Sequence, residues 1–544
     1  MSSNPDSSRR ELILSRLREA LAPLLPDFLV KRRWFGGKSR AIRSATVLDV
    51  VPLPAGIVDA LIAVIRVEYA IGPGETYSLP LLWKPTEHSI AGDIASLTVT
   101  IDGVPEPTLL YDAMSDPEFL SFLLEAIADG RCYAGVGGEI KATPTSALSK
   151  YWQADRDRLQ PVPMKVEQSN SSVVYGGTLV LKLFRRLEEG INPDVEIGTF
   201  LTEKTRFANV PAVAGHLEYV GKHREPSSLG ILQTFVRNQG DAWRLTLDAV
   251  REYYERAKRT SLSETAVPRA GLLAMAEQAI PKKAESVIGV YMDWARLLGE
   301  RTAELHLALA SEPGDPNFSP EPFVSADTQS FCDSAIELLT RNFDLLRQRR
   351  HLLGDRTQAG VLPTLELEES ARYQFRSLLY MNLTAKRTRI HGDYHLGQVL
   401  FTGNDFVIID FEGEPARSLA ERRAKRSPLQ DVASMLRSFH YAAYAPVLAE
   451  ENEEARRALD VWARYWYAWV AAMFLRTYIE VCGKAPHIPQ DRFEMETLLD
   501  AYILDKAVYE LGYELNNRPE WLAIPLQGVA SLLSNAPVRK RNAS

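Results

Sequence analysis

Apolar residues recur along this chain with two different spacings. In the first part, runs rich in Val and Ile predict strands, which are expected at Ala45–Val51, Ile57–Tyr69 and Tyr77–Lys84. From Asp241 onward, apolar residues recur every three or four positions, the spacing of amphipathic helices. Helices are expected there at Asp293–Leu309, Ser330–Arg347, Leu365–Leu379, Asp431–Ala443, Glu454–Cys482 and Arg492–Leu511. The chain should therefore be an α+β protein with a mainly helical second half.

The segment between these two parts mixes strands and helices. Gly176-Gly177 is a hairpin turn signal that separates the predicted strands Ser172–Tyr175 and Thr178–Phe184. A helix is expected at Asn192–Lys204, because Pro193 suits its first turn. The other expected elements are helices at Glu11–Leu25 and Asp116–Ile127 and strands at His216–Val220 and Gly230–Phe235. These changes of pattern predict three domains, at residues 1–110, 111–238 and 239–544.

Composition limits the function and the location of the protein. The 544 residues carry 63 Lys and Arg against 70 Asp and Glu, so no basic surface for nucleic acid is expected. Three distant cysteines, Cys132, Cys332 and Cys482, argue against a disulfide framework and a cysteine-based zinc site. The start of the chain has no signal-peptide pattern, and the apolar windows are shorter than the roughly 20 residues of a membrane helix. A cytoplasmic protein without a nucleic-acid or membrane partner is expected.

The stretch Ile390–Glu414, with the sequence IHGDYHLGQVLFTGNDFVIIDFEGE, concentrates the candidate chemistry. Asp393 precedes a predicted hairpin, Gln398 opens its first strand, and Asp410 ends its second strand. Glu412 would share a face with Asp410 if this strand continued, because side chains alternate along a strand. One hairpin would then bring together a carboxylate that takes a proton and hard oxygen ligands for magnesium. Phosphoryl transfer from ATP needs these groups.

The pattern H-G-D-x4-Q…I-D-F-E, from His391 to Glu412, resembles the aminoglycoside-phosphotransferase branch of the kinase-like superfamily. The resemblance implies a bilobal protein-kinase-like fold in which the three predicted domains are an N-terminal α+β cap, a small mixed N-lobe and a large mainly helical C-lobe. It also implies Asp393 as the catalytic base, with Asp410 and Glu412 as magnesium ligands. Gln398 stands where the superfamily usually has a metal-binding Asn, and its carbonyl oxygen lies one methylene further out. In the alternative interpretation both residues are structural: Asp393 caps a helix, and Asp410 ends a strand at a turn.

The nucleotide side is expected in the N-lobe. Gly176 and Gly177 would form the turn over the ATP phosphates, and Lys182 follows within the apolar run LVLKLF. Lys182 would point its ammonium group toward the interior. The alternative is a surface lysine on a strand whose side chains alternate between the two faces. Glu196, on the next predicted helix, is the favoured ion-pair partner of Lys182, and Asp194 is the alternative on the same helix.

The connection between the two lobes is expected at Gln233–Val236. By the same resemblance, the backbone around Gln233 and Phe235 would meet the adenine ring. ATP and magnesium are therefore the implied cofactors.

Four stretches that cover most of the chain in order resemble bacterial maltokinases. They are RRWFGGKSR (Arg32–Arg40), FVRNQGDAW (Phe235–Trp243), HLGQVL (His395–Leu400) and DFEGEPARSLAERRAKRSPLQDVASMLRSFHYAAY (Asp410–Tyr444). The resemblance implies transfer of the ATP γ-phosphate to the anomeric hydroxyl of maltose. The product, maltose 1-phosphate, feeds α-glucan and glycogen synthesis from trehalose. Because maltokinases are often fused to trehalose synthase, a functional association with that enzyme is implied.

Two other interpretations of the function stay open. Related bacterial kinases with a similar cap phosphorylate glucosamine, and sugar selectivity depends on pocket geometry that a sequence does not display. A catalytically inactive regulatory module is the second alternative. Such a module would usually lack one of the transfer groups, whereas Asp393, Gln398, Asp410 and Lys182 are all present.

The acceptor site is less determined by the sequence. Candidate sugar contacts are His395, Glu414, Arg437 and Tyr441. Arg437 and Tyr441 lie four positions apart on one predicted helix face, a spacing more typical of core than of a ligand site. His395 would otherwise be a structural hydrogen-bonding residue of the catalytic loop. Asp431 is expected to fix the backbone of that loop.

Two aromatic segments admit both a packing role and a ligand role. Trp34–Lys38 could place a lysine near phosphate, but packing between the cap and the N-lobe is favoured. The cluster Trp462–Trp469 could line a disaccharide groove, but core packing is again favoured.

Overall fold

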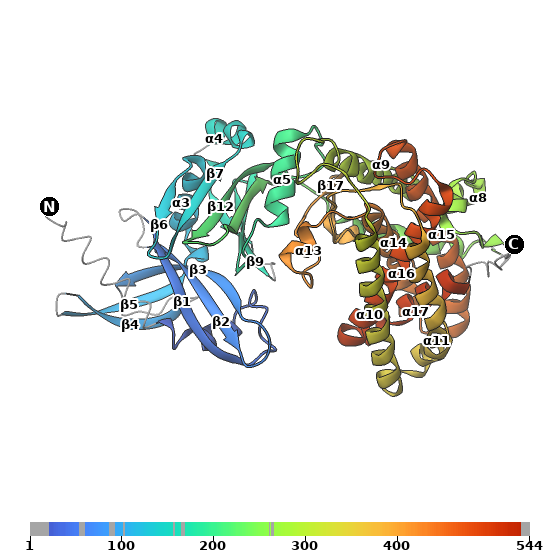
Figure 1. The fold of residues 1–544 in the computed structure, drawn as a ribbon, viewed down its shortest axis with the longest axis horizontal. Helices are drawn as coiled ribbons and strands as arrows, with labels where there is room; N and C mark the ends of the chain where they lie inside the picture. Colours follow the sequence, from blue (N-terminus) through green and yellow to red (C-terminus); the bar gives the residue numbers. More distant parts are fainter. Residues whose placement is uncertain are drawn as a thin grey trace. The chain divides into compact units, whose positions relative to one another are not determined.

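The computed structural model describes residues 21–53, 60–85, 93–101, 104–155, 158–164, 169–260, 262 and 266–534. The chain divides into two compact units, which are drawn in Figure 1. The first unit is Met1–Lys204 with Pro211–Val236, and the second is Thr205–Val210 with Arg237–Ser544. The predicted helix Glu11–Leu25 lies largely outside the described residues, and the first described helix is α2 (Leu25–Val30).

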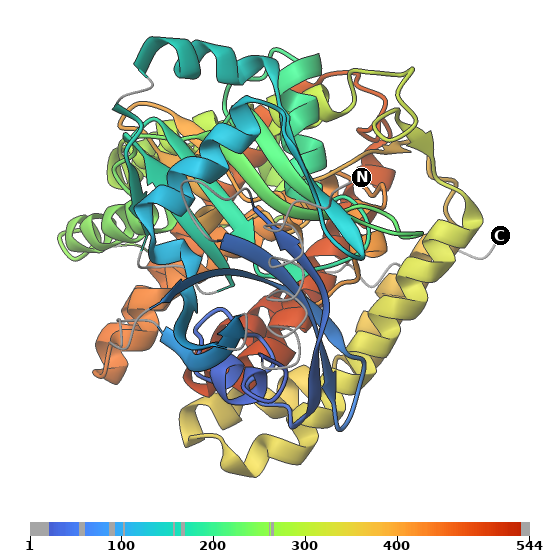
Figure 2. The ribbon, with the colours of Figure 1, turned by 90° about the vertical axis from the view of Figure 1, so that its left-hand side faces the viewer.

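The first unit begins with an antiparallel sheet in the order β1-β2-β3-β5-β4, and the short strand β11 pairs with β3. Its strands are β1 (Ile42–Pro52), β2 (Ala60–Tyr69), β3 (Glu75–Pro85), β4 (Asp93–Ile101), β5 (Val104–Asp112) and β11 (Arg186–Leu187). Strand β2 is buried along nearly its whole length, which accounts for its continuous apolar run. Figure 2 shows the twist of the blue strands. The three strands predicted in this region are present, and β4 and β5 are additional.

A second antiparallel sheet follows, in the order β6-β7-β12-β13-β10-β9-β8. Its strands are β6 (Cys132–Ala134), β7 (Gly138–Pro144), β8 (Pro161–Pro163), β9 (Asn170–Tyr175), β10 (Leu179–Phe184), β12 (Val213–Gly221) and β13 (Ser227–Thr234), and its helices are α3 (Pro117–Ala128), α4 (Ser149–Asp155) and α5 (Pro193–Lys204). Helix α3 begins where the sequence predicts, because Asp116 Oδ1 accepts the N–H groups of Glu118 and Phe119 at 3.0 Å. The strand, turn, strand, helix order predicted for this segment is confirmed.

Arg185 joins the two sheets of the first unit, and its side chain is only 2% exposed. Its Nη2 donates to Asp112 Oδ2 and its Nε donates to Ser171 Oγ, both at 2.8 Å. The ring of Trp34 lies 4.8 Å from its guanidinium carbon. A buried cation needs such partners, so this contact fixes the first sheet to the second.

The segment Trp34–Lys38 is a packing turn of the first sheet. Phe35 is buried, and its ring centroid lies 5.2 Å from that of Tyr77. A Cβ atom at Gly37 would lie 2.2 Å from the Tyr69 hydroxyl, so only glycine fits there. The packing interpretation of this segment is confirmed.

The second unit is mainly helical. Its helices are α6 (Ala242–Ala257), α7 (Leu272–Ala276), α8 (Lys282–Ile288), α9 (Tyr291–Leu309), α10 (Ser325–Arg349), α11 (Asp355–Leu365), α12 (Glu368–Ser377), α13 (Leu419–Arg423), α14 (Leu429–Ala449), α15 (Glu453–Cys482), α16 (Arg492–Asn517) and α17 (Ala523–Ser534). Two short hairpins complete it, β14 (Glu321–Pro322) with β15 (Lys386–Arg387) and β16 (Val399–Phe401) with β17 (Phe406–Ile408). The helix predicted at Leu365–Leu379 is present as α12, which begins three residues later than predicted, at Glu368. The α+β fold class is confirmed.

Helices α9 and α15 pack together, as do α14 and α16, and these pairs surround the core of the second unit (Figure 1). Trp462, Trp466 and Trp469 of α15 are buried there, so the core interpretation of this cluster is confirmed. Within the described part of the chain, no helix combines the length and the low polarity that crossing a membrane requires.

Candidate active site

A buried carboxylate fixes the backbone of the loop that carries Asp393. Asp431, on α14, accepts the N–H of His391 at 2.7 Å and the N–H of Gly392 at 2.9 Å. His306, on α9, lies 3.1 Å from the same carboxylate. Burial alone would raise the pKa of Asp431, but His306 and the loop N–H groups hold it below its usual value. Asp431 therefore stays ionised and holds the loop in place, as the sequence indicates.

Asp393 is half-buried, with a cationic or polar group near each oxygen. Lys506 Nζ lies 3.8 Å from Oδ1, and His395 Nε2 lies 3.9 Å from Oδ2. Both distances exceed hydrogen-bond length. Among the described residues, none donates a hydrogen bond to this carboxylate, so its lone pairs are available to an acceptor hydroxyl.

His395 has a structural role within the same loop. Its Nδ1 accepts the N–H of Gly397 at 3.0 Å. Burial lowers the pKa of His395, so the ring is neutral at pH 7 and carries its proton on Nε2, the atom nearer Asp393. These contacts favour the structural alternative over a sugar contact.

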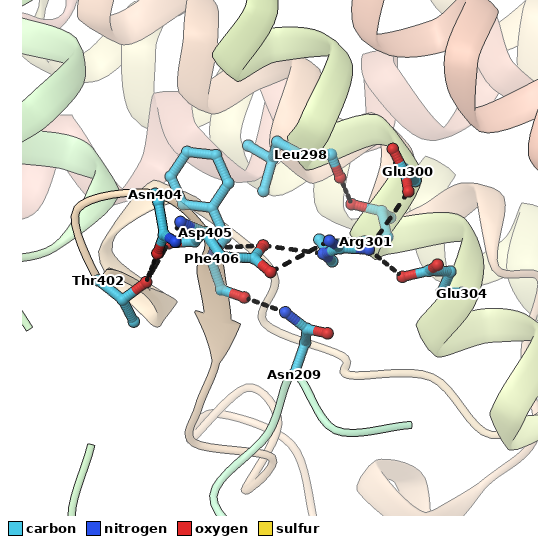
Figure 3. A network of polar contacts seen from close by, with 10 residues as sticks. Asn209, Leu298, Glu300, Arg301, Glu304, Thr402, Asn404, Asp405 and Phe406 are labelled. Carbon is cyan, nitrogen blue, oxygen red and sulfur yellow. Dashed lines mark hydrogen bonds and ion pairs between the residues drawn. The ribbon is translucent and has the colours of Figure 1, made fainter. Parts of the chain in front are cut away.

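The hairpin β16–β17 is anchored from two sides (Figure 3). Arg301, on α9, donates from Nε to Asp405 Oδ1 at 2.8 Å and from Nη2 to Oδ2 at 3.1 Å. Asn209 Nδ2 donates to the carbonyl oxygen of Phe406 at 2.8 Å. A bidentate arginine–carboxylate pair is both strong and directional. The turn of the hairpin is therefore fixed, and with it the residues that flank its two strands.

Asp410 follows this hairpin in a left-handed backbone conformation, with a φ of +67°. Strand β17 ends at Ile408, so the prediction that Asp410 and Glu412 share a strand face is wrong. The bend nevertheless brings the two side chains together, with carboxylate oxygens within 4.8 Å of each other. A positive φ is uncommon outside glycine, and such backbone strain clusters at functional sites.

The pair of Asp410 and Glu412 fits a magnesium ion. Magnesium binds hard oxygen ligands, usually one or two carboxylates together with phosphate oxygens and water. Gln398 was the third predicted ligand, but its Nε2 donates to Asp410 Oδ2 at 3.0 Å. In this orientation Gln398 holds the Asp410 carboxylate in place, and only a rotation of its amide would present an oxygen instead.

In the first unit, strand β10 carries Lys182 between buried leucines. Lys182 Nζ lies 3.4 Å from Asp194 Oδ2, and Asp194 is buried in the first turn of α5. Asp194, the alternative partner, therefore forms an ion pair with Lys182. The favoured pairing of Lys182 with Glu196 stays a prediction.

The turn between β9 and β10 needs both of its glycines. Gly176 and Gly177 have φ values of +58° and +64°, which L-residues with side chains rarely adopt. Gln233 lies on β13, the strand paired with β10, and Phe235 donates its N–H to the carbonyl of Thr178 at 2.8 Å. The first unit ends one residue after Phe235. Contact of these residues, and of Glu196, with ATP stays a prediction.

Arg437 and Tyr441 belong to the core between α14 and α16. Arg437 is 2% exposed and donates to Glu510 Oε2 from Nε at 2.9 Å and from Nη2 at 2.5 Å. Tyr441 donates to Glu514 at 3.0 Å and stacks on Trp521. The prediction that these two residues contact the sugar is wrong, because their polar groups are already used within the core.

A cavity of about 630 Å³ in the second unit is the candidate acceptor site. Glu414, a predicted sugar contact, lines it together with the α16 residues Asp505, Lys506 and Tyr509. Lys506 connects this cavity to the catalytic loop, because its ammonium lies 3.8 Å from Asp393. Sequence reasoning missed the α16 residues. The only available signal was the pair of adjacent charges in the apolar stretch from Leu498 to Leu511.

Opposite charges are interleaved around this cavity. Glu414 accepts from Arg417 Nε at 2.8 Å. Burial raises the pKa of Glu414, but Lys506 and Arg417 more than offset this and hold it below its usual value. Asp505 behaves differently, because burial raises its pKa to about 6. At neutral pH, Glu414 therefore stays ionised, whereas Asp505 titrates just below neutral pH.

The raised pKa of Asp505 predicts a stability change with pH. An unfolded Asp titrates near pH 3.9, so the folded protein binds the extra proton between about pH 4 and 6 and loses stability as pH rises through that window. We expect Asp505→Asn to raise the free energy of unfolding at pH 8 by about 1–3 kcal/mol and to change it little at pH 4. Urea unfolding at both pH values measures this. Asp344→Asn, at an exposed position on α10, is the matched control. An equal effect of Asp505→Asn at both pH values would contradict the assignment.

Two segments of the chain match models of known protein families. Residues 28–116 match the model of the maltokinase N-terminal cap domain, and residues 291–470 match the model of a phosphotransferase enzyme family. A glucosamine kinase of Mycolicibacterium smegmatis is 26% identical over 387 residues, which are 68% of this chain and 79% of that protein. A glucosamine kinase of Streptacidiphilus jiangxiensis is 25% identical over 378 residues, covering 68% and 72% of the two chains.

Solved structures show the same fold. A glucosamine kinase in complex with glucosamine, ADP and inorganic phosphate superposes with a TM-score of 0.59 at 16% identity, covering 92% of this chain and 97% of that chain. A crystal form of glucosamine kinase, form B, gives a TM-score of 0.60 at 18% identity, with 93% and 97% covered. The predicted kinase-like bilobal fold is confirmed.

The fixed catalytic loop, the hairpin with its two carboxylates and the matched catalytic domain make this chain a kinase-like phosphotransferase. A second feature narrows the class. Residues 28–116 match a maltokinase-type N-terminal cap domain ahead of the phosphotransferase domain, so the resemblance predicted from the sequence is confirmed.

Proposed function

We propose that this protein is an ATP-dependent maltokinase, which transfers the γ-phosphate to the anomeric hydroxyl of maltose and forms maltose 1-phosphate. The observation that carries this proposal is the maltokinase-type cap at residues 28–116, joined in one chain to a phosphotransferase domain. Glucosamine is the second candidate acceptor, because the two related kinases described above are named for it.

The candidate acceptor cavity supports a neutral disaccharide. Its volume of about 630 Å³ lies within the range of about 300–1,000 Å³ that accommodates drug-sized ligands. Six basic and five acidic side chains line it. Sugar hydroxyls can donate to the carboxylates and accept from the cations, and the small excess of basic side chains favours a neutral acceptor over the ammonium of glucosamine. The carboxylate of Glu414 is already paired with Arg417, so it is a poor partner for an added ammonium.

The geometry supports a division of tasks among the residues. Asp393 would take the proton of the acceptor hydroxyl, because its carboxylate has no hydrogen bond from the described residues. Lys506 would hydrogen-bond a neighbouring sugar hydroxyl and so orient the reacting one. Asp410 and Glu412 would hold magnesium, which supplies charge neutralisation at the phosphates when bound. Lys182, paired with Asp194, would contact the ATP phosphates.

The remaining predictions belong to the same proposal. Residues 1–110, 111–238 and 239–544 would be the cap, the N-lobe and the C-lobe. A cytoplasmic location stays an expectation from the sequence pattern. A role in α-glucan and glycogen synthesis from trehalose and a functional association with trehalose synthase rest on the family resemblance.

A panel of acceptor sugars tests the proposal directly. The purified protein is incubated with ATP, magnesium and either maltose, glucose, trehalose or glucosamine, and the phosphorylated position is read by NMR. We expect maltose to be the preferred acceptor and the phosphate to be on its anomeric oxygen. Preferential phosphorylation of glucosamine would replace maltose by the second candidate, and phosphorylation of no sugar would refute both.

A lysine substitution tests the acceptor cavity. Because Lys506 lines the cavity and lies beside Asp393, we expect Lys506→Met to raise the KM for the acceptor about tenfold or more and to leave the KM for ATP nearly unchanged. Lys258→Met, at the exposed C-cap position that follows α6, is the matched control and should change neither constant. A Lys506→Met enzyme with unchanged acceptor KM would remove this residue from the acceptor site.

A further inference from the structure

A second groove of the second unit is lined by four arginines. It lies where α11, α14, α15 and α17 meet and has a volume of about 590 Å³. Its arginines, Arg356, Arg456, Arg457 and Arg464, define what we call the arginine groove. None of the residues lining it lines the candidate acceptor cavity, so the two sites are separate. Figure 1 shows α11 and α17 side by side, away from the catalytic hairpin β16–β17 within this unit.

The positive charge of the arginine groove is not balanced within it. Asp460 is the one carboxylate among its lining residues, and it is already engaged. Arg464 Nε donates to Asp460 Oδ2 at 3.0 Å, and Gln527 Nε2 donates to Oδ1 at 3.1 Å. Arg457 pairs with Glu453, outside the groove. Two arginines therefore remain without a carboxylate.

These two arginines, Arg356 on α11 and Arg456 on α15, line the same groove. Burial and the charge of Arg456 lower the pKa of Arg356. The recorded partner of the Arg356 guanidinium is a neutral carbonyl, that of Val447, at 3.2 Å. No described residue gives the Arg456 guanidinium a hydrogen bond or an ion pair. Two like charges held together in this way lower the stability of the empty protein, and an anion between them would reverse the effect.

The start of helix α17 adds to the positive potential. Helix α17 begins at Ala523, and its first two residues, Ala523 and Ile524, line the arginine groove. The first turn of a helix leaves backbone N–H groups without helical partners and carries a partial positive charge. Arginine side chains and the start of a helix are groups that favour a bound phosphate, and both line this groove.

We propose that the arginine groove binds the phosphate monoester of a small sugar, at a site separate from the reaction centre. Phosphate is favoured because planar guanidinium groups pair with its oxygens in bidentate fashion. An ester is favoured over free phosphate because the groove is much larger than one phosphate ion and has an apolar floor for a carbon skeleton. That floor is formed by Val447, Leu448, Val461 and Ile524. Such a site would let a phosphorylated metabolite act on the enzyme without competing for the acceptor cavity.

Calorimetric titration with three probes tests this inference. Glucose 1-phosphate, inorganic phosphate and glucose are each titrated into the full chain at one fixed ionic strength. We expect saturable binding of glucose 1-phosphate, weaker binding of phosphate and no binding of glucose. In the double variant Arg356→Gln/Arg456→Gln, the affinity for glucose 1-phosphate should fall about tenfold or more. Arg251→Gln, an exposed arginine of α6 paired with Asp248, is the matched control and should bind like the parent protein.

Thermal unfolding gives a second readout that does not depend on catalysis. Without phosphate, the double variant should melt at a higher temperature than the parent, because the like-charge contact is gone. The parent should gain stability when glucose 1-phosphate is added, and the double variant should gain none.

Three results would overturn the inference. Equal binding of glucose 1-phosphate by the parent and the double variant would place any phosphate site elsewhere. Equal stabilisation of the parent by chloride and by glucose 1-phosphate at matched ionic strength would indicate only general screening. Tighter binding of a hexaglutamate peptide than of glucose 1-phosphate would mark the groove as a contact for an acidic protein segment.

Discussion

Replacing Asp393 with Asn should lower kcat by about 10²–10⁴-fold, the usual contribution of a positioned general base. Asn keeps the size of the side chain but does not take the proton of the acceptor hydroxyl. The loop should keep its conformation, because its hydrogen bonds to Asp431 come from the backbone of His391 and Gly392. ATP binding should therefore change little. The measurement is kcat with ATP and maltose, together with nucleotide affinity by fluorescence or calorimetry.

The control for this variant is Asp248→Asn, at an exposed carboxylate of α6. Its kcat and its melting temperature should equal those of the parent. If Asp393→Asn folds normally and phosphorylates maltose at the parent rate, Asp393 is not the base. If both variants lose activity together, the loss is not specific to the catalytic loop.

Replacing Asp410 with Asn should abolish magnesium-dependent activity, with a fall in kcat of at least about a hundredfold, because one of the two proposed carboxylate ligands is lost. Asn is the appropriate substitution here, since it tolerates the left-handed conformation that Asp410 adopts at a φ of +67°. Ala at this position would add backbone strain and confuse loss of metal with loss of structure. The measurement is kcat as a function of magnesium concentration, after removal of metal with EDTA.

The parent enzyme should lose its activity in EDTA and regain it when magnesium is added. The Asp410→Asn variant should need more magnesium for half-maximal activity, or should not recover at all. Activity of this variant at the parent level, with the same magnesium dependence, would exclude Asp410 as a ligand. Gln398→Ala provides a comparison. If Gln398 only holds Asp410, its loss should have a smaller effect than loss of the carboxylate.

The catalytic hairpin could be predicted from the sequence because its groups are near neighbours along the chain. Asp393, Gln398 and Asp410 lie within 18 consecutive residues, and a hairpin between them leaves few possible arrangements. The details of the hairpin were harder to predict. The end of β17 at Ile408 and the left-handed bend at Asp410 arise from local backbone geometry, which side-chain alternation does not reveal.

Residues brought together by helix packing could not be predicted in the same way. Lys506 lies 113 positions after Asp393, and only the packing of the second unit places it 3.8 Å away. Helical spacing correctly indicated that Arg437 and Tyr441 share a face, but it did not show that Glu510 and Glu514 of another helix meet them. The contact of Asp194 with Lys182 likewise depends on which side of α5 faces β10, which the sequence does not show.

The two sheets of the first unit share their interior, and this limits how the enzyme can be shortened. Ser78 donates its N–H to the carbonyl of Arg185 at 2.8 Å and its hydroxyl to the carbonyl of Phe184 at 2.7 Å. On the other side, Asp49 accepts the Tyr219 hydroxyl at 2.9 Å. Removal of the first sheet would expose these groups and would leave the guanidinium of Arg185 without its carboxylate partner Asp112. The first sheet is thus an integral part of the first unit, and any transfer of the second sheet into another protein has to include the first.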